Sequence, residues 1–202
     1  MSSWRNGGTV GGNLVQVTGS RQPTYRASTA AYNNKPTVQF ATDDVLAVDI
    51  ADVAQPFYLL VIGNTAGGTD IERLVGIGGG EADSNGSGFG DNSAGTYSLR
   101  AGAPTLTGGS TNASPRLFRG TYNGASSALS VDGAATASGT TGTGAAEVFV
   151  LGAASDATLS AFSYHLNGSI AYAALFTTDP SGQAEWSTFK AWVTSFYGIT
   201  VA

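Results

Sequence analysis

The stretch Ser169–Thr177, with the sequence SIAYAALFT, decides the fold of this chain. It is apolar at nearly every position and carries β-branched and aromatic residues, a pattern typical of a strand buried on both faces. The turn-forming residues Asp179-Pro180-Ser181-Gly182 follow and end the strand. Because such a strand needs an apolar layer on each side, we expect it in the middle of a layered β structure.

An amphipathic helix is expected over about residues 181–197, directly after this strand. Four apolar residues recur at the spacing of one helical face: Trp186, Phe189, Val193 and Phe196. Gly198 stands where helices commonly end in a left-handed residue. The helix therefore needs a flat apolar surface to lie on, which we expect to be the flank of a sheet.

The rest of the chain favours strands. Pro56–Gly63, PFYLLVIG, is continuously apolar and is expected to be a central strand. Asn123-Gly124 and Asp132-Gly133 are typical of tight hairpin turns. About twelve strands and one helix fit an all-β, antiparallel sandwich of two sheets with a C-terminal helix, and the length fits one domain over residues 1–202.

A series of short motifs runs through the first quarter of the chain. They comprise Trp4, Asn6, Gln16, Thr18, Arg21, Pro23, Tyr25, Asn34, Pro36, Val38, Phe40, Asp43, Asp44 and Leu46. This order, followed by the strand, Asn-Gly, strand, Asp-Gly pattern, resembles the concanavalin A-like (laminin G-like) jelly-roll domains of bacterial surface proteins and phage virion proteins. Gln22 is an insertion relative to that pattern. The resemblance implies a jelly-roll sandwich.

Composition excludes several classes of partner. The formal net charge is −5, and the only lysines are Lys35 and Lys190, so we expect no nucleic-acid partner. No apolar run is long enough to span a membrane, and the N-terminus lacks a secretion signal, so neither a membrane nor a signal peptide is expected. With 29 glycines and 11% charged residues, the surface is made of small side chains that lose little entropy when covered. This favours large, permanent contacts, although a GC-rich genome explains the same composition.

The sequence contains no recognisable catalytic set. A retaining glycosidase needs two carboxylates about 5 Å apart, and the nearest match to an E-x-D-x-E strand is Glu81-Ala82-Asp83 in a glycine-rich segment. His165 is the only histidine, there is no G-x-S-x-G motif, and there are no cysteines. We therefore expect that the chain is not an enzyme and has no catalytic residues or cofactor.

Two acidic or glycine-rich segments are candidates for a calcium site and for an assembly site. Asp43 and Asp44 are the best candidates for calcium, but acidic residues in turns often cap backbone amides and no D-x-D-x-D spacing is present, so we expect no metal site. The low-complexity segment Gly78–Gly95 is expected to be a surface loop, either without a function or serving as an assembly loop. The residues that would bind in the second case are Asp83, Asn85, Phe89 and Asp91, with Phe89 at the apolar tip.

The family resemblance implies a non-catalytic structural protein at the surface of a bacteriophage virion. Such a protein is a capsid decoration or tail-surface protein, binds other virion proteins and can be a homo-oligomer. The alternative is a carbohydrate-binding, lectin-like adhesion module for glycans of the host cell surface. Sugar rings stack on exposed aromatic side chains, but the tryptophans are expected to pack inside, which leaves as candidates Tyr32, Tyr122 and Tyr164.

Overall fold

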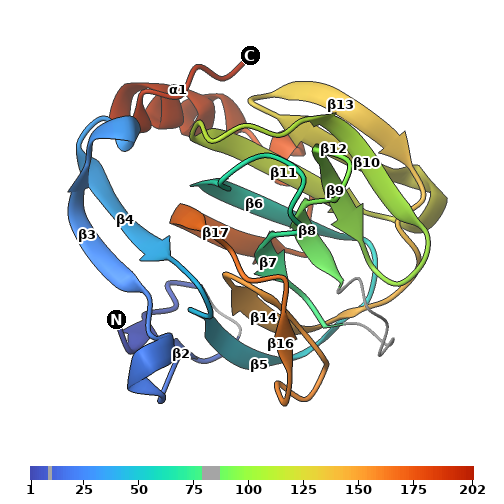
Figure 1. Ribbon diagram of the computed structural model, residues 1–202. Helices are drawn as coiled ribbons and strands as arrows, with labels where there is room; N and C mark the ends of the chain where they lie inside the picture. The colour runs from blue at the N-terminus through green and yellow to red at the C-terminus, as the bar shows by residue number, and fades with distance from the viewer. Residues whose placement is uncertain (9–10, 79–86) are drawn as a thin grey trace.

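Two antiparallel sheets face each other, and one α-helix lies across the outside of one of them (Figure 1). This arrangement is seen in the computed structural model, which describes residues 1–8, 11–78 and 87–202. All strand pairs in these residues are antiparallel. The predicted class, an all-β antiparallel sandwich with a C-terminal helix, is confirmed.

The first sheet has eight strands among the described residues. In spatial order they are β1 (Ser3–Trp4), β2 (Leu14–Val15), β5 (Leu46–Val53), β14 (Ala146–Leu151), β7 (Arg73–Gly76), β8 (Gly88–Asp91), β9 (Thr96–Arg100) and β10 (Thr105–Ser110).

The second sheet has seven strands in the same part of the chain. In spatial order they are β13 (Ala134–Gly139), β12 (Ser127–Val131), β11 (Arg116–Tyr122), β6 (Phe57–Asn64), β17 (Gly168–Phe176), β4 (Lys35–Phe40) and β3 (Thr24–Thr29). Strand β6 holds the fourth position, so the expected central strand is confirmed.

Shorter elements complete the fold. The strands β15 (Ala154–Ser155) and β16 (Phe162–Ser163) pair with each other. Phe162 packs on a small apolar cluster in and beside β5 and β14, which consists of Val45, Ala47, Val148, Val150 and Ala153. Turns of 3₁₀ helix occupy Gly19–Arg21, Ala30–Tyr32, Gly124–Ser126 and Pro180–Gly182, and the α-helix α1 spans Trp186–Tyr197. The predicted helix thus begins later than expected, because Asp179 caps the 3₁₀ turn through the Ser181 N–H. It ends as expected at Gly198, whose φ is 75°.

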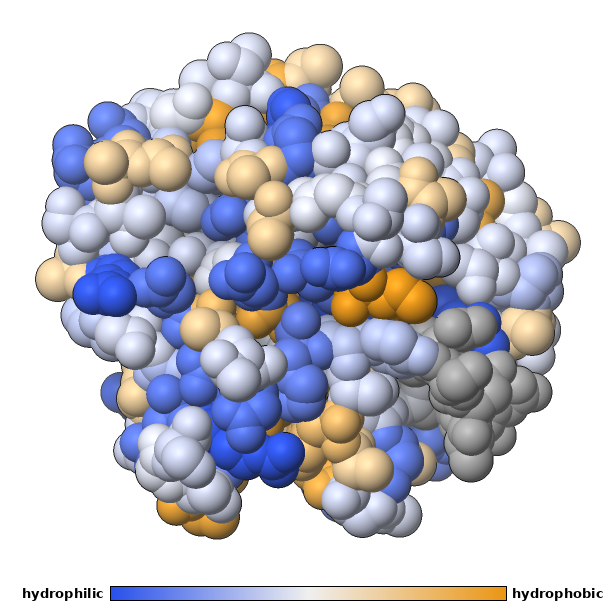
Figure 2. Space-filling model, viewed as in Figure 1, coloured by the Kyte–Doolittle hydropathy of each residue, from blue (hydrophilic) through white to orange (hydrophobic). Residues whose placement is uncertain are grey.

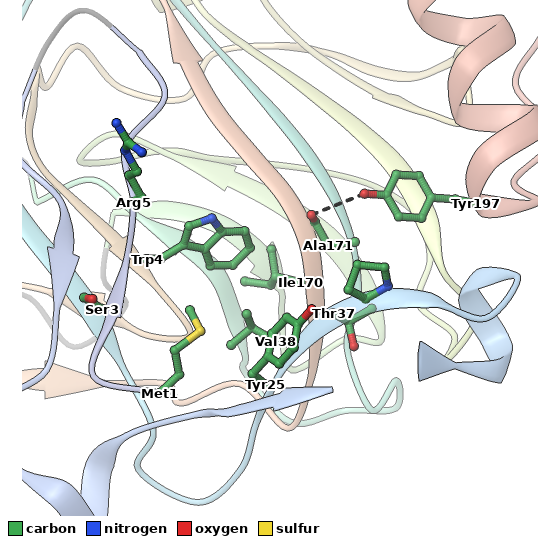
Figure 3. A pocket seen from close by; sticks show the side chains of 11 residues that line it. Met1, Ser3, Trp4, Arg5, Tyr25, Thr37, Val38, Ile170, Ala171 and Tyr197 are labelled. Atoms are coloured by element: carbon green, nitrogen blue, oxygen red, sulfur yellow. Dashed lines mark hydrogen bonds between the residues drawn. The ribbon is translucent and has the colours of Figure 1, made fainter. Parts of the chain in front are cut away.

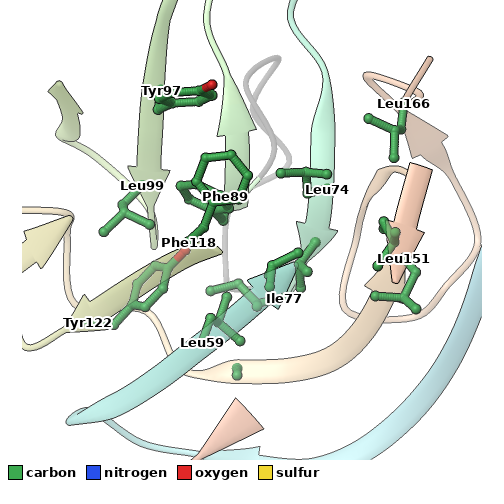
Figure 4. Packing of buried hydrophobic residues seen from close by; sticks show 14 of the residues in the cluster. Leu59, Leu74, Ile77, Phe89, Tyr97, Leu99, Phe118, Tyr122, Leu151 and Leu166 are labelled. Carbon is green, nitrogen blue, oxygen red and sulfur yellow. The ribbon is translucent and has the colours of Figure 1, made fainter. Parts of the chain in front are cut away.

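The main core fills the space between the two sheets. Its aromatic part contains a stacked pair, Phe57 and Tyr122, with ring centroids 4.6 Å apart. Phe118 lies against both Phe89 and Tyr97, at 5.0 and 4.9 Å (Figure 4). These rings come from β6, β8, β9 and β11, so both sheets contribute to one cluster.

Strand β6 is apolar on both faces because two different layers cover it. Leu59 and Val61 point into the main core, whereas Ile62 belongs to a second cluster under the helix. This helix cluster consists of Tyr32, Ile62, Leu117, Val193, Tyr197 and Ile199. Helix α1 therefore lies on the outer face of the seven-stranded sheet.

Strand β17 is less buried than the sequence predicts. Ile170 is its only fully buried residue, and the other eight positions are half-buried. The prediction that both faces of this strand are buried is therefore wrong. The layers on its two faces cover it incompletely. Ala173 and Leu175 pack against the main core, and Ala171 and Tyr172 pack against the helix cluster, but all four side chains stay partly accessible.

We predict that Val193→Ala lowers the free energy of unfolding by about 1.5–3 kcal/mol, because it removes two buried methyl groups and leaves a cavity under α1. Thr194→Ala, at the exposed position next to it, is the matched control and should change stability by less than about 0.5 kcal/mol. Urea unfolding of both variants measures the difference. Equal losses would contradict the docking of α1 through Val193.

Candidate functional site

The seven-stranded sheet opens between two of its inner strands. Strand β17 pairs with β4 only over Gly168–Ile170, after which the two strands diverge. On its other edge β17 stays paired with β6 as far as Phe176. We call the opening between Ala171–Phe176 and the start of β4 the split.

A pocket of about 290 Å³ lies at the narrow end of the split. Figure 3 shows that Met1, Trp4 and Val38 gather on one side of it, beside Ile170. Trp4 is held there because β1 pairs with β2, and its ring packs against the main core. The inner side of the pocket is therefore apolar.

The rim of the pocket is more polar and more exposed. Tyr25 is 56% exposed, and Arg5 and Pro36 are exposed beside it. The Tyr197 hydroxyl donates a hydrogen bond of 3.5 Å to the Ala171 carbonyl oxygen. Burial raises the pKa of Tyr197, so this phenol stays protonated and remains a donor. The site can thus hold an apolar group inside and polar groups at the rim.

A row of aromatic side chains runs along α1 on the same outer face. It consists of Trp186, Phe189, Trp192 and Phe196, with successive ring centroids 5.5, 5.7 and 5.4 Å apart. Tyr172 of β17 joins the row at Phe189, and the Lys35 ammonium lies 4.6 Å from the Phe196 ring centroid. Trp192 is 37% exposed. The expectation that the tryptophans are all packed inside is therefore wrong for Trp192.

The structure places the calcium candidates in ordinary turn contacts. The Asp43 carboxylate is 3.1 Å from Nε of Arg21. The Asp44 carboxylate accepts the Ala41 N–H at 2.9 Å. Within the described ranges, no three His, Cys, Asp or Glu side chains gather where they could hold a metal ion.

The predicted assembly loop is partly a core strand. Asp83 and Asn85 lie outside the described residues, but Phe89 and Asp91 belong to β8 and are each 1% exposed. The prediction that Phe89 is an exposed tip is wrong. The glycines beside it resemble those of a loop, but they belong to the strand. A Cβ at Gly90 would lie 1.9 Å from the Glu72 carbonyl oxygen, so strand pairing requires glycine here.

Asp91 is part of a buried polar cluster at the start of β7 and the end of β8. The Arg73 guanidinium donates to the carbonyl oxygen of Asp91 at 2.5 Å and to Ser98 Oγ at 3.4 Å. The Glu72 carboxylate accepts the N–H groups of Ala66 and Asn167 at 2.9 and 3.1 Å. Burial raises the pKa of the Asp91 carboxyl to about 7 and lowers that of Arg73 to about 10. These contacts join β7 to β8 and hold the segments around Ala66 and Asn167 against the start of β7.

The tyrosines proposed for sugar stacking do not offer open faces. Tyr32 and Tyr122 are buried, at 1% and 0% exposure. The ring of Tyr164 has the Arg73 guanidinium 5.7 Å from its centroid. The exposed aromatic residues are instead Tyr25 and Trp192.

The pocket residues are far apart in the sequence. Trp4, Tyr25 and Pro36 belong to the family-like pattern, but nothing in their spacing indicates that they share a pocket with Ala171 and Tyr197. The sequence shows only that segment 171–176 is apolar, and this does not reveal that its strand is unpaired on one side.

No known family model matches the chain, and no curated protein matches it by sequence. Similar solved structures exist. A sialidase of Trypanosoma rangeli in complex with the inhibitor DANA matches with a TM-score of 0.56 and 14% identity, covering 95% of this chain and 32% of the sialidase. The same enzyme in complex with sialic acid matches with a TM-score of 0.53 and 15% identity, covering 79% of this chain and 27% of the sialidase. The chain thus shares an antiparallel β-sandwich fold with part of these sialidases, and it spans about a third or less of their length.

The expectation that the chain is not an enzyme must be corrected. It came from the absence of paired carboxylates and of a G-x-S-x-G motif, whereas the solved structures that share the fold are sialidases. Sialidases use a tyrosine nucleophile, so those two absences do not test for their chemistry. At 14–15% identity the likeness shows the fold and assigns no catalytic residue to this chain.

We predict that Asp91 makes the folded chain less stable as the pH rises from about 4 to about 7. An unfolded aspartate loses its proton near pH 3.9, whereas the folded one keeps it up to about pH 7, so the folded state binds more protons in this window. Asp91→Asn should remove this slope and be more stable than the wild type at pH 8, by about 1–4 kcal/mol. Urea unfolding at several pH values measures the slope.

Asp52→Asn, at an exposed position of β5, is the matched control for this series and should keep the wild-type slope. An unchanged slope in Asp91→Asn would show that the Asp91 carboxyl is already ionised at low pH.

Proposed function

We propose that the protein is a surface component of a bacteriophage virion, on the head or the tail, that binds other virion proteins. The observation that carries this proposal is the apolar surface formed by β17 and the aromatic row of α1. Tyr172, Phe176 and Phe189 are half-buried there, and Trp192 is exposed. Apolar surface that remains accessible and is contiguous marks a contact site for another protein.

The rest of the surface supports permanent assembly. Figure 2 shows a face that is mostly pale, with strongly hydrophilic residues in limited areas. Only 11% of the residues are charged, and Gly accounts for 29 positions. Side chains of this kind lose little conformational entropy when a partner covers them, so a large interface forms at low cost. No helix in the described part of the chain is long and apolar enough to cross a membrane.

A second candidate function is carbohydrate binding. The observation that favours it is the pocket rim, where the exposed ring of Tyr25 stands near Trp4 and Arg5. Aromatic faces with a few polar groups are suited to sugar rings. The fold is shared with a sialidase whose structure contains sialic acid, and this supports the candidate only at the level of fold.

The virion proposal predicts that the chain is found in purified particles released by the cells that encode it. Quantitative mass spectrometry should detect it at a fixed ratio to the main capsid protein, high for the head and low for the tail. Trp192→Ala should reduce incorporation by at least about tenfold, since exposed aromatic anchors often contribute more than about 1.4 kcal/mol to an interface. Thr194→Ala on the same helix is the control and should incorporate normally.

Absence of the wild-type chain from particles would contradict the virion proposal. The carbohydrate candidate then becomes the leading one, and a glycan array tests it. Tyr25→Ala should abolish the binding of any glycan that the wild type retains, whereas Tyr25→Phe, which keeps the ring, should preserve it.

A further inference from the structure

The open edge of β17 is a row of backbone groups. Successive residues of an antiparallel strand direct their N–H and C=O groups to alternate sides, so about half of those in Ala171–Phe176 face away from β6. The Ala171 carbonyl oxygen accepts the Tyr197 hydroxyl, so the groups left for a new strand begin at Tyr172. Within residues 1–8, 11–78 and 87–202, no strand pairs with this edge beyond Ile170. Such a row is a template for another extended chain.

This edge also lacks the usual protection against pairing. Exposed strand edges in natural proteins commonly carry a lysine, a proline or an inward-pointing charge. The six residues of the edge, AYAALF, contain none of these. By contrast, the facing start of β4 contains Lys35 and Pro36, and a proline has no N–H to donate. An incoming strand is therefore expected to pair with β17 rather than with β4.

The pocket gives the same edge a place for a side chain. It begins beside Ile170 and Ala171 and has Met1 and Trp4 on its inner side. Its volume of about 290 Å³ exceeds the roughly 150 Å³ that suffices to hold benzene in an apolar cavity. An extended segment lying along β17 would direct every second side chain toward the core, and one of these can enter the pocket.

We propose that the split receives an extended segment of a partner protein, which adds to β17 as a new strand. The segment has uncharged, apolar residues at alternate positions, and one of them fills the pocket. Arg5 lines the pocket, so an acidic residue next to the inserted side chain is favoured. Backbone pairing provides affinity and the pocket provides selectivity, as in other cases of strand addition. This inference rests on the proposed function only in that the occupant belongs to another protein.

The test uses the full chain and a random displayed peptide library, so it does not depend on virions. Selected peptides should have alternating apolar residues. In synthetic versions, N-methylation at every second residue should weaken binding by at least about tenfold, and methylation at the residues between should have little effect. The proposal would be overturned if the effect of N-methylation on binding did not alternate from one peptide residue to the next. It would also be overturned if the library yielded no enriched peptide.

Two protein variants locate the bound peptide. Ala171→Leu partly fills the pocket and should weaken binding by at least about tenfold, while Ala191→Leu, the same change at an exposed position of α1, should not. Circular dichroism and thermal unfolding verify that both variants fold, and the N-methylation series tests the pairing if Ala171→Leu does not fold. Equal peptide binding by the two variants would show that the peptide does not bind at the pocket.

Light scattering of the wild-type chain tests whether a second copy of the chain occupies the split instead. A dimer that Ala171→Leu dissociates would mean that a second copy occupies the split, and the proposed partner segment would be rejected. Peptide binding without incorporation into particles would contradict only the proposed function, whereas incorporation without peptide binding would contradict only strand addition.

Discussion

The pairing of β6 with β17 is the interaction on which the rest of the structure depends. β6 pairs with β17 from Ser169 to Phe176 on one edge and with β11 along the other. Its inner residues hold the two sheets together, while Ile62 on its outer face anchors α1. Because one strand serves both apolar layers, neither the helix nor the sandwich can shift without the other. The C-terminal part of the chain thus supplies both an inner strand of the sheet, β17, and the helix that packs on its outer face, α1.

The split follows from the same pairing. The β6–β17 register shifts between Ile170 and Tyr172, and β4 leaves β17 at this point. The bulge places both Ala171 and Tyr172 against the helix cluster. Strand β17 therefore turns toward α1 and separates from β4, which stays paired with β3. The pocket is therefore a result of how the core is assembled. Trp4 and Met1, which pack against the main core, line the resulting pocket.

The sequence predicts the layers of this protein well and its surfaces poorly. The apolar run of β6, the face of α1 and the stop at Gly198 follow from local periodicity, and they are found where expected. The apolar run of β17 predicts full burial because hydrophobicity cannot show how completely the layers on each face cover a strand. The glycines around Phe89 predict a loop because they resemble a linker, whereas Phe89 lies in β8. The pocket depends on residues that lie more than 130 positions apart, such as Trp4 and Ala171, and local patterns carry no information about such contacts.

The close approach of β8 to β7 has a consequence for how this chain can evolve. A Cβ at Gly88 would lie 2.1 Å from the Val75 carbonyl oxygen of β7, and one at Gly90 would lie 1.9 Å from the carbonyl oxygen of Glu72, just before β7. Neither position therefore accepts even alanine without separating the strands. The segment GFGD has the composition of a spacer, yet it is among the least substitutable parts of the protein. Distant relatives with the same strand pairing should keep a glycine, core side chain, glycine alternation here, and that alternation offers a way to find them.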